Sequence, residues 1–398
     1  MTISQSGLER LHEAMGARVA DRVFPGIVTL IAQGDDVHVD AIGTLSFERR
    51  EPLQRNTIFR ITSMTKPILA AATKMLVEHG RLALDEPVDR LLPELARLRV
   101  LERIDGPLDK TVPANRPITL EDLLTFRLGH GLVVEPTFDP PFPVITAANA
   151  LGLALGPPEP RTPHAPDEWI RRFATLPLMY QPGQRWQYNT GSMVLSVLIA
   201  RAAGQSLEHV LRTRIFAPLG MSETGFSLSA SDVGRLPDQY MPDVQTGKLQ
   251  VYAASSAEVW TEPPVFPSGA GGLLSTVDDY LAFARLLLNR GIHKGRRLLS
   301  ERSLELMTTN HLTPEQIAGG GPILHGEGWG YGMAVSVRPD EISSRPGRYG
   351  WAGGYGTIWF NDPHRNLVAM AMTQAADFLF NGSADEFSRL AAGAVSSR

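Results

Sequence analysis

A serine and a lysine three residues apart, at the start of a predicted helix, are the first candidates for chemistry in this chain. An apolar helical pattern runs from Ile68 to Val77 and stops at Gly80. Pro67 fits only the first turn of that helix, because deeper in it the ring would remove a hydrogen bond and clash. Ser63 is therefore expected at the helix N-terminus, where free N–H groups and the helix dipole favour negative charge.

Lys66 follows Ser63 by three residues, so the two side chains share one face of the helix. A buried lysine that loses its proton can activate a neighbouring serine as a nucleophile. The alternative is an ordinary N-cap serine beside a solvated lysine. Only five of the 38 basic residues are lysines. A lysine at this place favours the nucleophile hypothesis, because arginine could not give up its proton.

A second candidate group is the segment 186–192, which directly precedes the apolar helical pattern Met193–Ala203. Tyr188 lies at this loop–helix junction, from which a phenol can point into a cleft. Alternatively, Trp186 and Tyr188 are core aromatics. A phenolate whose pKa is lowered by a nearby ammonium could take the serine proton and later return it to a leaving group.

A third group is the glycine-rich segment 349–357, directly before an apolar strand pattern. Glycines such as Gly353 and Gly354 allow a substrate to approach the backbone closely, so that strand N–H groups could form an oxyanion hole. The alternative is a glycine-rich hairpin turn.

Composition excludes several other classes of protein. A net charge of −4 and a pI near 6.2 give no reason to expect nucleic acid or an anionic membrane as a partner. The absence of cysteine excludes disulfides, thiolate zinc sites and a cysteine nucleophile. The Gly-x-Ser-x-Gly pentapeptide of α/β-hydrolases does not occur. None of the ten histidines has a zinc-ligand spacing such as His-Glu-x-x-His, and we expect no metal and no cofactor. The N-terminus lacks a basic flank and an apolar core, which predicts a cytoplasmic protein without a signal peptide.

The elements that must position these residues form two groups. The first group predicts an antiparallel sheet covered by helices from both chain ends, an α+β fold. Its members are helices at 6–22, 275–289 (opened by Ser275–Asp278) and 386–395, and strands at 27–33, 36–42, 330–338, 356–361 and 367–373.

The second group lies between residues 81 and 260. It combines short helical patterns with long Pro-rich stretches, such as 133–166, that could frame a pocket. The helices are predicted at 119–127, 166–175, 190–203 and 206–213. We therefore expect a discontinuous sheet domain (1–80 and 261–398), a mainly helical domain (81–260), and the active site between them.

Taken together, the motifs resemble the serine β-lactamase and DD-peptidase superfamily, nearest to class C β-lactamases and family VIII carboxylesterases. The resemblance covers most of the chain and implies a β-lactamase-like fold. The segments that carry it are Phe24–Gly26, Phe59–Lys66, Leu82–Val88, Ile118–Thr125, Pro182–Asn189, Pro218–Met221 and the box around Trp351.

The resemblance also implies roles for the site residues. Ser63 would be the nucleophile, Lys66 its basic partner and Tyr188 the second general base and acid. The N–H groups of Ser63 and Gly354 would form the oxyanion hole. Further substrate-binding residues implied in the same way are Trp351, Gly353 and Asn189.

Two departures from the lactamase pattern bear on function. Trp351-Ala352-Gly353 stands where lactamases and peptidases have Lys-Thr-Gly, and it is similar to the esterase branch. The lysine that usually binds a substrate carboxylate is therefore missing. In the tyrosine motif, Asn189 comes one residue early. The segment 126–130 also replaces the more usual Thr-x-Ser-Gly pattern.

These observations predict a serine carboxylesterase that hydrolyses small neutral esters through an acyl-enzyme. One alternative is a β-lactamase, D-amino-acid amidase or acyltransferase on the same scaffold. Another is a binding module without catalysis, against which the intact Ser63, Lys66 and Tyr188 argue. The expected partner is a small-molecule ester, with no nucleic acid and no membrane.

Overall fold

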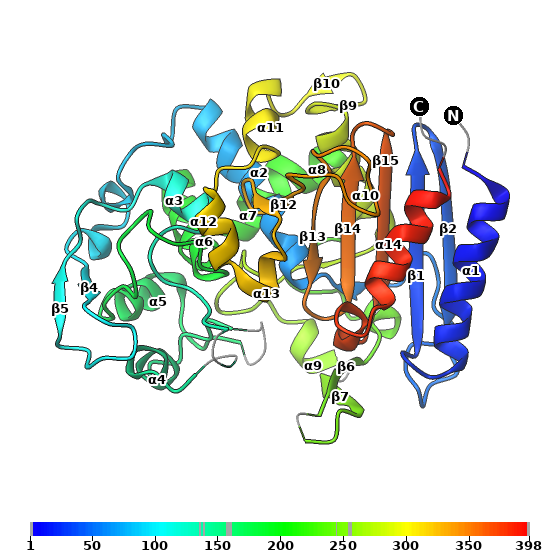
Figure 1. Ribbon diagram of the computed structural model, residues 1–398, viewed down its shortest axis with the longest axis horizontal. Helices are drawn as coiled ribbons and strands as arrows, with labels where there is room; N and C mark the ends of the chain where they lie inside the picture. Colours follow the sequence, from blue (N-terminus) through cyan, green and yellow to red (C-terminus); the bar gives the residue numbers. More distant parts are fainter. Residues whose placement is uncertain are drawn as a thin grey trace.

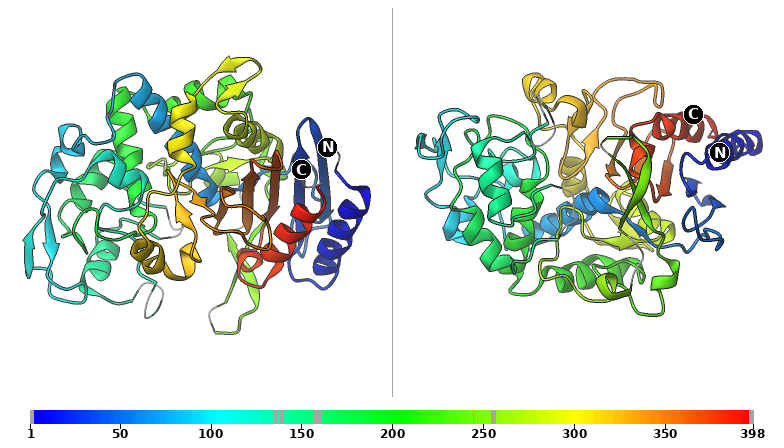
Figure 2. Two further views of the ribbon diagram at one scale, coloured as in Figure 1. Left: turned by 45° about the horizontal axis from the view of Figure 1, so that its top comes forward. Right: turned by 90° about the horizontal axis from the view of Figure 1, so that it is seen from below.

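The computed structural model describes residues 3–134, 137, 140–156, 161–243, 245–253 and 257–395. Its main feature is a seven-stranded antiparallel sheet, which lies beside a mainly helical region (Figures 1 and 2). In spatial order the strands are β11 (Gly328–Trp329), β12 (Ala334–Val335), β13 (Tyr349–Gly353), β14 (Thr357–Asp362), β15 (Leu367–Thr373), β1 (Gly26–Gln33) and β2 (Asp36–Gly43). The predicted α+β, β-lactamase-like fold is thus confirmed.

Every residue of the neighbouring strands β15 and β1 is buried. Because successive side chains of a strand point in opposite directions, these strands contribute to a core on each face of the sheet. Ile27 and Ile31 of β1 pack with the helices α1 (Gln5–Ala20) and α14 (Ser383–Gly393), which cover one face of the sheet. Val28 and Leu30 belong to the large core on the other face. The two chain ends meet at this outer layer, where the amide of Ser4 donates to the carbonyl of Ala394 (2.8 Å).

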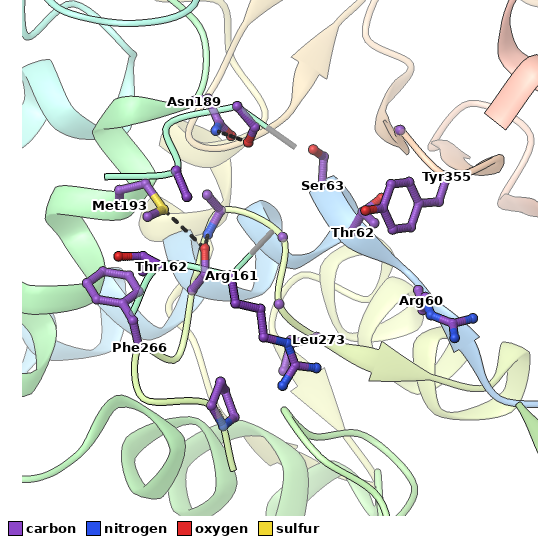
Figure 3. A pocket seen from close by; sticks show the side chains of 18 of the residues that line it. Arg60, Thr62, Ser63, Arg161, Thr162, Asn189, Met193, Phe266, Leu273 and Tyr355 are labelled. Carbon is purple, nitrogen blue, oxygen red and sulfur yellow. Dashed lines mark hydrogen bonds between the residues drawn. The ribbon is translucent and has the colours of Figure 1, made fainter. Parts of the chain in front are cut away.

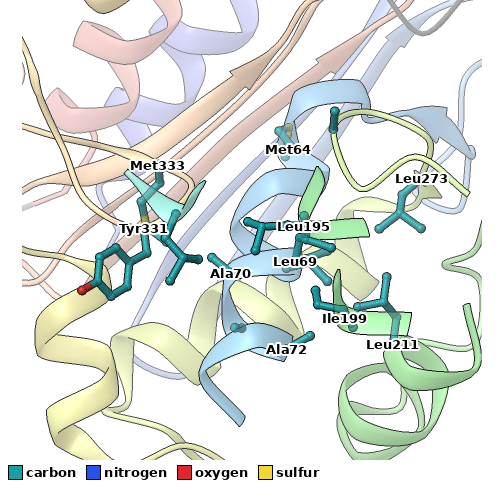
Figure 4. Packing of buried hydrophobic residues seen from close by; sticks show 14 of the residues in the cluster. Met64, Leu69, Ala70, Ala72, Leu195, Ile199, Leu211, Leu273, Tyr331 and Met333 are labelled. Carbon is teal, nitrogen blue, oxygen red and sulfur yellow. The ribbon is translucent and has the colours of Figure 1, made fainter. Parts of the chain in front are cut away.

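The core on the inner face surrounds helix α2 (Thr65–Glu78), all but two of whose residues are buried. Leu69 of α2 packs beside Leu195 and Ile199 of α6 (Thr190–Ala203), and Tyr331 lies on the opposite side of the helix (Figure 4). Full burial of each such aliphatic side chain stabilises the fold by about 1.5–3 kcal/mol. Helix α2 is therefore fixed from both sides, and its N-terminus is held in one place.

The other elements connect or cover these layers. The remaining helices are α3 (Leu120–Leu124), α4 (Pro143–Ala150), α5 (Pro166–Phe173), α7 (Leu207–Leu211), α8 (Ala217–Leu219), α9 (Ala257–Trp260), α10 (Val277–Leu288), α11 (Glu301–Met307), α12 (Pro314–Gly319) and α13 (Gly321–Leu324), with short helical turns between several of them. The small two-stranded sheets pair β3 (Phe59–Arg60) with β8 (Leu274–Ser275), β4 (Arg99–Leu101) with β5 (Thr111–Pro113), β6 (Gln239–Pro242) with β7 (Leu249–Ala253), and β9 (Ile292–His293) with β10 (Arg296–Arg297).

The prediction of one strand at 330–338 was wrong. A turn at Gly330–Met333 separates β11 from β12, and Gly332 adopts a positive φ of 75° there. A β-carbon on Gly332 would lie 2.6 Å from the carbonyl oxygen of Lys66. The turn thus packs directly on helix α2, which the local sequence pattern does not reveal.

The helix predicted to open at Ser275 begins two residues later. Ser275 lies in β8 opposite Phe59, and Thr276 is the N-cap, whose hydroxyl accepts from the amide of Asp279 (3.3 Å). The Pro-rich stretch 133–166 contains helix α4, which was predicted as loop, and residues 135–136, 138–139 and 157–160 of that stretch lie outside the described part of the chain. The division into two domains stays a prediction.

Candidate active site

Ser63 lies on a short 3₁₀ turn, Thr62–Met64, that leads directly into α2. Thr62 has a φ of 39°, a left-handed conformation that is rare for a β-branched residue and costs about 1–3 kcal/mol. The strand before it, β3, is held by β8. This backbone turns the chain sharply at the nucleophile position and places Ser63 on the wall of a cavity.

Lys66 lies one helical turn after Ser63 and is 1% exposed. Its Nζ lies 2.9 Å from Ser63 Oγ and donates a hydrogen bond to the carbonyl of Ala270 (2.5 Å). Burial lowers the pKa of Lys66 well below its usual value, because the charged form loses its hydration. Burial therefore favours the neutral form of the amine beside the serine hydroxyl.

Tyr188 reaches the same point from the other side, two residues before α6. Its ring centre is 4.5 Å from Lys66 Nζ. Its phenol oxygen accepts a hydrogen bond from Trp351 Nε1 (2.7 Å) and also hydrogen-bonds with Ser63. Burial raises the pKa of Tyr188, although these two hydrogen bonds act in the opposite direction. From the sequence we expected a phenolate whose pKa is lowered by the ammonium. In the resting site the pKa of Tyr188 is instead raised, so the phenol is neutral.

The unusual segment 126–132 holds Tyr188 in place. Phe126 has a φ of 57°, which ends α3 earlier than predicted, and its carbonyl accepts from the amide of Gln187 (2.8 Å). The amide of Leu132 donates to the carbonyl of Tyr188 (2.9 Å). A β-carbon on Gly131 would lie 2.6 Å from that carbonyl oxygen. The two segments therefore pack backbone against backbone, which requires glycine at position 131.

His130 of the same segment is buried behind the site. Its Nδ1 lies 3.4 Å from Thr190 Oγ1, and its ring meets Phe173 edge-on. Burial lowers the pKa of His130 to about 4, so that the imidazole is neutral. It packs beneath the start of α6 and thereby supports the Tyr188 junction.

Strand β13 brings the glycine-rich box against the nucleophile turn. A β-carbon on Gly353 would lie 2.3 Å from the carbonyl oxygen of Ile61 and 2.5 Å from Thr62 Oγ1, whereas one on Gly354 would meet nothing within 4 Å. Gly353 thus permits the close approach of strand and turn. Gly354 lies on the cavity wall together with Ser63.

The cavity has a volume of about 190 Å³. Figure 3 shows Ser63 on its wall with Asn189 and Tyr355 on either side. Its lining is mostly apolar; the larger apolar side chains are Leu132, Met193, Met241, Trp260, Phe266 and Leu273. Of the residues that the structure describes, Ser63, Tyr188, Asn189 and Gly354 line the cavity, but Trp351 and Gly353 do not.

Asn189 uses its side chain to fix a loop of the cavity wall. Its Nδ2 donates to the carbonyls of Leu155 (2.7 Å) and Gly156 (3.2 Å). Its backbone has a φ of 83° at the N-cap of α6. The residue predicted as substrate-binding therefore shapes the wall and the orientation of the preceding tyrosine.

Sequence reasoning missed two cavity residues, Arg60 and Arg161. Their guanidinium groups lie 4.4 and 4.5 Å from the ring centre of Trp260, so both stack on one indole. Arg60 is buried and donates to the carbonyl of Pro237 (2.6 Å). These contacts join segments about 100 to 200 residues apart, and no local pattern indicates them.

Within the described residues, no group of three or more His, Asp or Glu side chains is arranged to hold a metal ion. None of the helices in the described part of the chain has the length and apolar character needed to cross a membrane.

The fold and the site together define a serine hydrolase of the β-lactamase-like fold. The sequence model of the family described as Beta-lactamase matches residues 11–394. The chain belongs to this family.

Its relatives include proteins with different descriptions. An uncharacterized protein of Mycobacterium tuberculosis is 38% identical over 365 residues, which cover 88% of this chain and 86% of that protein. Esterase EstB of Burkholderia gladioli is 28% identical over 393 residues, covering 92% of this chain and 90% of its own. Among solved structures, EstCE1, described as a hydrolase with promiscuous acyltransferase activity, matches with a TM-score of 0.78 and 24% identity over 98% of each chain, which shows the shared fold.

Proposed function

We propose that this serine hydrolase is a carboxylesterase that hydrolyses small neutral esters through an acyl-enzyme on Ser63. The observation that carries the proposal is the distance of 2.9 Å between Lys66 Nζ and Ser63 Oγ on the wall of an apolar cavity. Esterase EstB supports the ester as substrate class by its name. A small volume and mostly apolar walls favour compact, uncharged acyl groups.

In the first step, Ser63 Oγ attacks the ester carbonyl while its proton passes to the neutral amine of Lys66. Burial keeps that amine neutral and therefore able to accept the proton. The N–H groups of Ser63 and Gly354 are proposed to bind the oxygen that becomes negative. The ammonium formed on Lys66 lies over the face of Tyr188, where the ring's π electrons favour a cation.

In the second step, the bond from carbon to the alcohol oxygen breaks, and that oxygen takes the proton of the Tyr188 hydroxyl. The Lys66 ammonium then restores the phenol. Water then attacks the acyl-enzyme by the same steps. Its proton passes to Lys66, Tyr188 protonates Ser63 Oγ as the leaving group, and the free acid is released. Each proton is thereby returned and the enzyme is regenerated.

Transfer of the acyl group to an alcohol is the second candidate function. The same acyl-enzyme serves both reactions, and the description of EstCE1 includes acyltransferase activity. A cavity with mostly apolar walls can admit an alcohol as readily as water. Ester products formed in the presence of an added alcohol would show this reaction directly.

Hydrolysis of p-nitrophenyl esters of increasing acyl length tests the proposal. We expect turnover with acetyl and butyryl esters, falling for long acyl chains, and none in Ser63→Ala. A protein that hydrolyses none of these esters is not a carboxylesterase of the proposed kind. The cytoplasmic location expected from the sequence stays a prediction.

A further inference from the structure

In the described part of the chain, Trp351 is the one member of the aromatic cluster around Tyr188 whose side chain donates a hydrogen bond to the phenol oxygen. Phe126, Trp186, Trp329 and Trp351 surround the tyrosine ring with centre-to-centre distances of 5.5 to 6.3 Å. Trp351 Nε1 donates to Tyr188 Oη at 2.7 Å, whereas Trp329 Nε1 donates to the carbonyl of Leu124 (3.3 Å).

The oxygen of a phenol carries one proton and has two positions for hydrogen bonds in the plane of the ring. When an N–H group donates at one position, the hydroxyl proton points to the other. At Tyr188 the indole of Trp351 occupies one side, and the second hydrogen-bond partner is Ser63. Both hydrogen bonds stabilise the deprotonated form of the phenol oxygen. Because the indole N–H occupies one side, the Tyr188 proton is left for the side of Ser63. Once the Ser63 proton has passed to Lys66, the phenol proton can point toward the serine, where the leaving oxygen of a bound ester would lie.

We propose that Trp351 is a positioning residue that makes Tyr188 the proton donor to the leaving alcohol. This inference rests on the proposed esterase function and deepens it. When the carbon–oxygen bond breaks, the leaving oxygen takes the Tyr188 proton, and the indole N–H stabilises the phenolate left behind. The Lys66 ammonium, which holds the former serine proton, then restores the phenol, so that all protons balance.

Esters with different alcohols separate this role from simple packing. The ratio kcat/KM reports the acylation step, in which the alcohol leaves. A p-nitrophenolate leaves without a proton, whereas an ethoxide requires one. Trp351→Phe keeps an aromatic ring and removes the N–H group. We expect it to lower kcat/KM for ethyl butyrate by about 10- to 100-fold more than for p-nitrophenyl butyrate.

Two control variants sharpen the comparison. Trp329→Phe removes an indole N–H from the same cluster without touching the phenol oxygen, so it should change both esters by the same factor. In a Tyr188→Phe background, Trp351→Phe should add no further difference between the esters, because the group through which it acts is gone.

The hydrogen bond itself can be measured without turnover. The chain has six tryptophans, so a ¹⁵N-tryptophan-labelled sample should give six indole N–H resonances in an NMR spectrum. The resonance that is missing in Trp351→Phe is the one of Trp351. In Tyr188→Phe this resonance should move strongly toward the position of an unbonded indole, and the Trp329 resonance much less.

The outcomes are distinct. A selective loss on ethyl butyrate together with the indole shift supports the inference. Equal losses on both esters, or an indole resonance that ignores Tyr188→Phe, overturns it. If the wild-type protein hydrolyses neither ester, the proposed esterase function fails, and the catalytic role of Trp351 fails with it even where the indole shift is seen.

Discussion

Lys66 Nζ lies 4.5 Å from the centre of the Tyr188 ring, so the proposed base and the proposed acid of the site are in direct contact. The lysine comes from the first turn of α2 and the tyrosine from the loop before α6. Packing of these two helices fixes the distance between the two groups. The contact lets the ammonium formed during acylation stay close to the group that it must reprotonate.

The neutral state of Lys66 determines the pH dependence. Only the unprotonated amine accepts the serine proton, so kcat/KM should fall as the pH decreases through the pKa of Lys66. Burial lowers that pKa well below the value of about 10.4 for an exposed lysine, so activity should persist to a lower pH than an exposed lysine would allow. Lys66→Arg should be inactive at every pH, because arginine stays charged. A pH–rate profile of kcat/KM for p-nitrophenyl butyrate measures both, and an active arginine variant would contradict the base assignment.

Tyr188→Phe should lower kcat by about 10²–10⁴-fold, the usual contribution of a general acid or base. The change removes only the hydroxyl and keeps the ring in its aromatic cluster. Tyr180→Phe is a matched control, since Tyr180 lies outside the site and contacts Arg185. A fully active Tyr188→Phe enzyme would return the residue to the role of a core aromatic.

The adjacent glycines 353 and 354 should respond differently to alanine. A β-carbon on Gly353 meets two backbone or hydroxyl oxygens at 2.3 Å, whereas one on Gly354 meets no atom within 4 Å. Gly353→Ala should lower the free energy of unfolding by about 1–3 kcal/mol as β13 moves away from the nucleophile turn. Gly354→Ala should leave it within about 0.5 kcal/mol. Denaturant unfolding of the two variants compares them, and equal stabilities would refute the tight packing at Gly353.

Selectivity should favour neutral esters over β-lactams that carry a carboxylate. The resemblance places an ammonium in lactamases where this chain has Trp351, whose N–H is already bound to Tyr188. A carboxylate bound beside Trp351 would lose hydration without an ionic partner at that strand position, because the two guanidiniums of the cavity, Arg60 and Arg161, lie on the Trp260 ring instead. We expect a higher kcat/KM for p-nitrophenyl butyrate than for nitrocefin. Comparable turnover of nitrocefin would instead support the β-lactamase alternative.

The sequence alone was sufficient for the parts of the site that depend on local patterns. Pro67 and the apolar repeat place Ser63 and Lys66 at a helix start, and the Met193–Ala203 repeat places Tyr188 at a junction. The antiparallel sheet and the helices at both chain ends were predicted from strand alternation and helical spacing in the same way, but the order of the strands was not.

The rest depends on contacts between distant segments. The bond from Trp351 to Tyr188 joins residues 163 positions apart, and the clamp of 126–132 on the tyrosine loop spans about 60. No local periodicity encodes such a pairing. For the same reason the contact of Trp351 with Tyr188 and the close packing of Gly353 on the nucleophile turn could not be predicted. Neither residue lines the cavity, and the expected contact of both with substrate stays a prediction.

The central claim is a covalent acyl group on Ser63, and trapping that intermediate tests it most directly. The wild-type protein would be mixed with p-nitrophenyl butyrate, quenched in acid during turnover, digested and analysed by mass spectrometry. The account predicts a butyryl group on the peptide that contains Ser63. It also predicts that Ser63→Ala carries no butyryl group and loses turnover by several orders of magnitude. A butyryl group on another residue, or about a tenth of wild-type turnover in Ser63→Ala, would contradict the account.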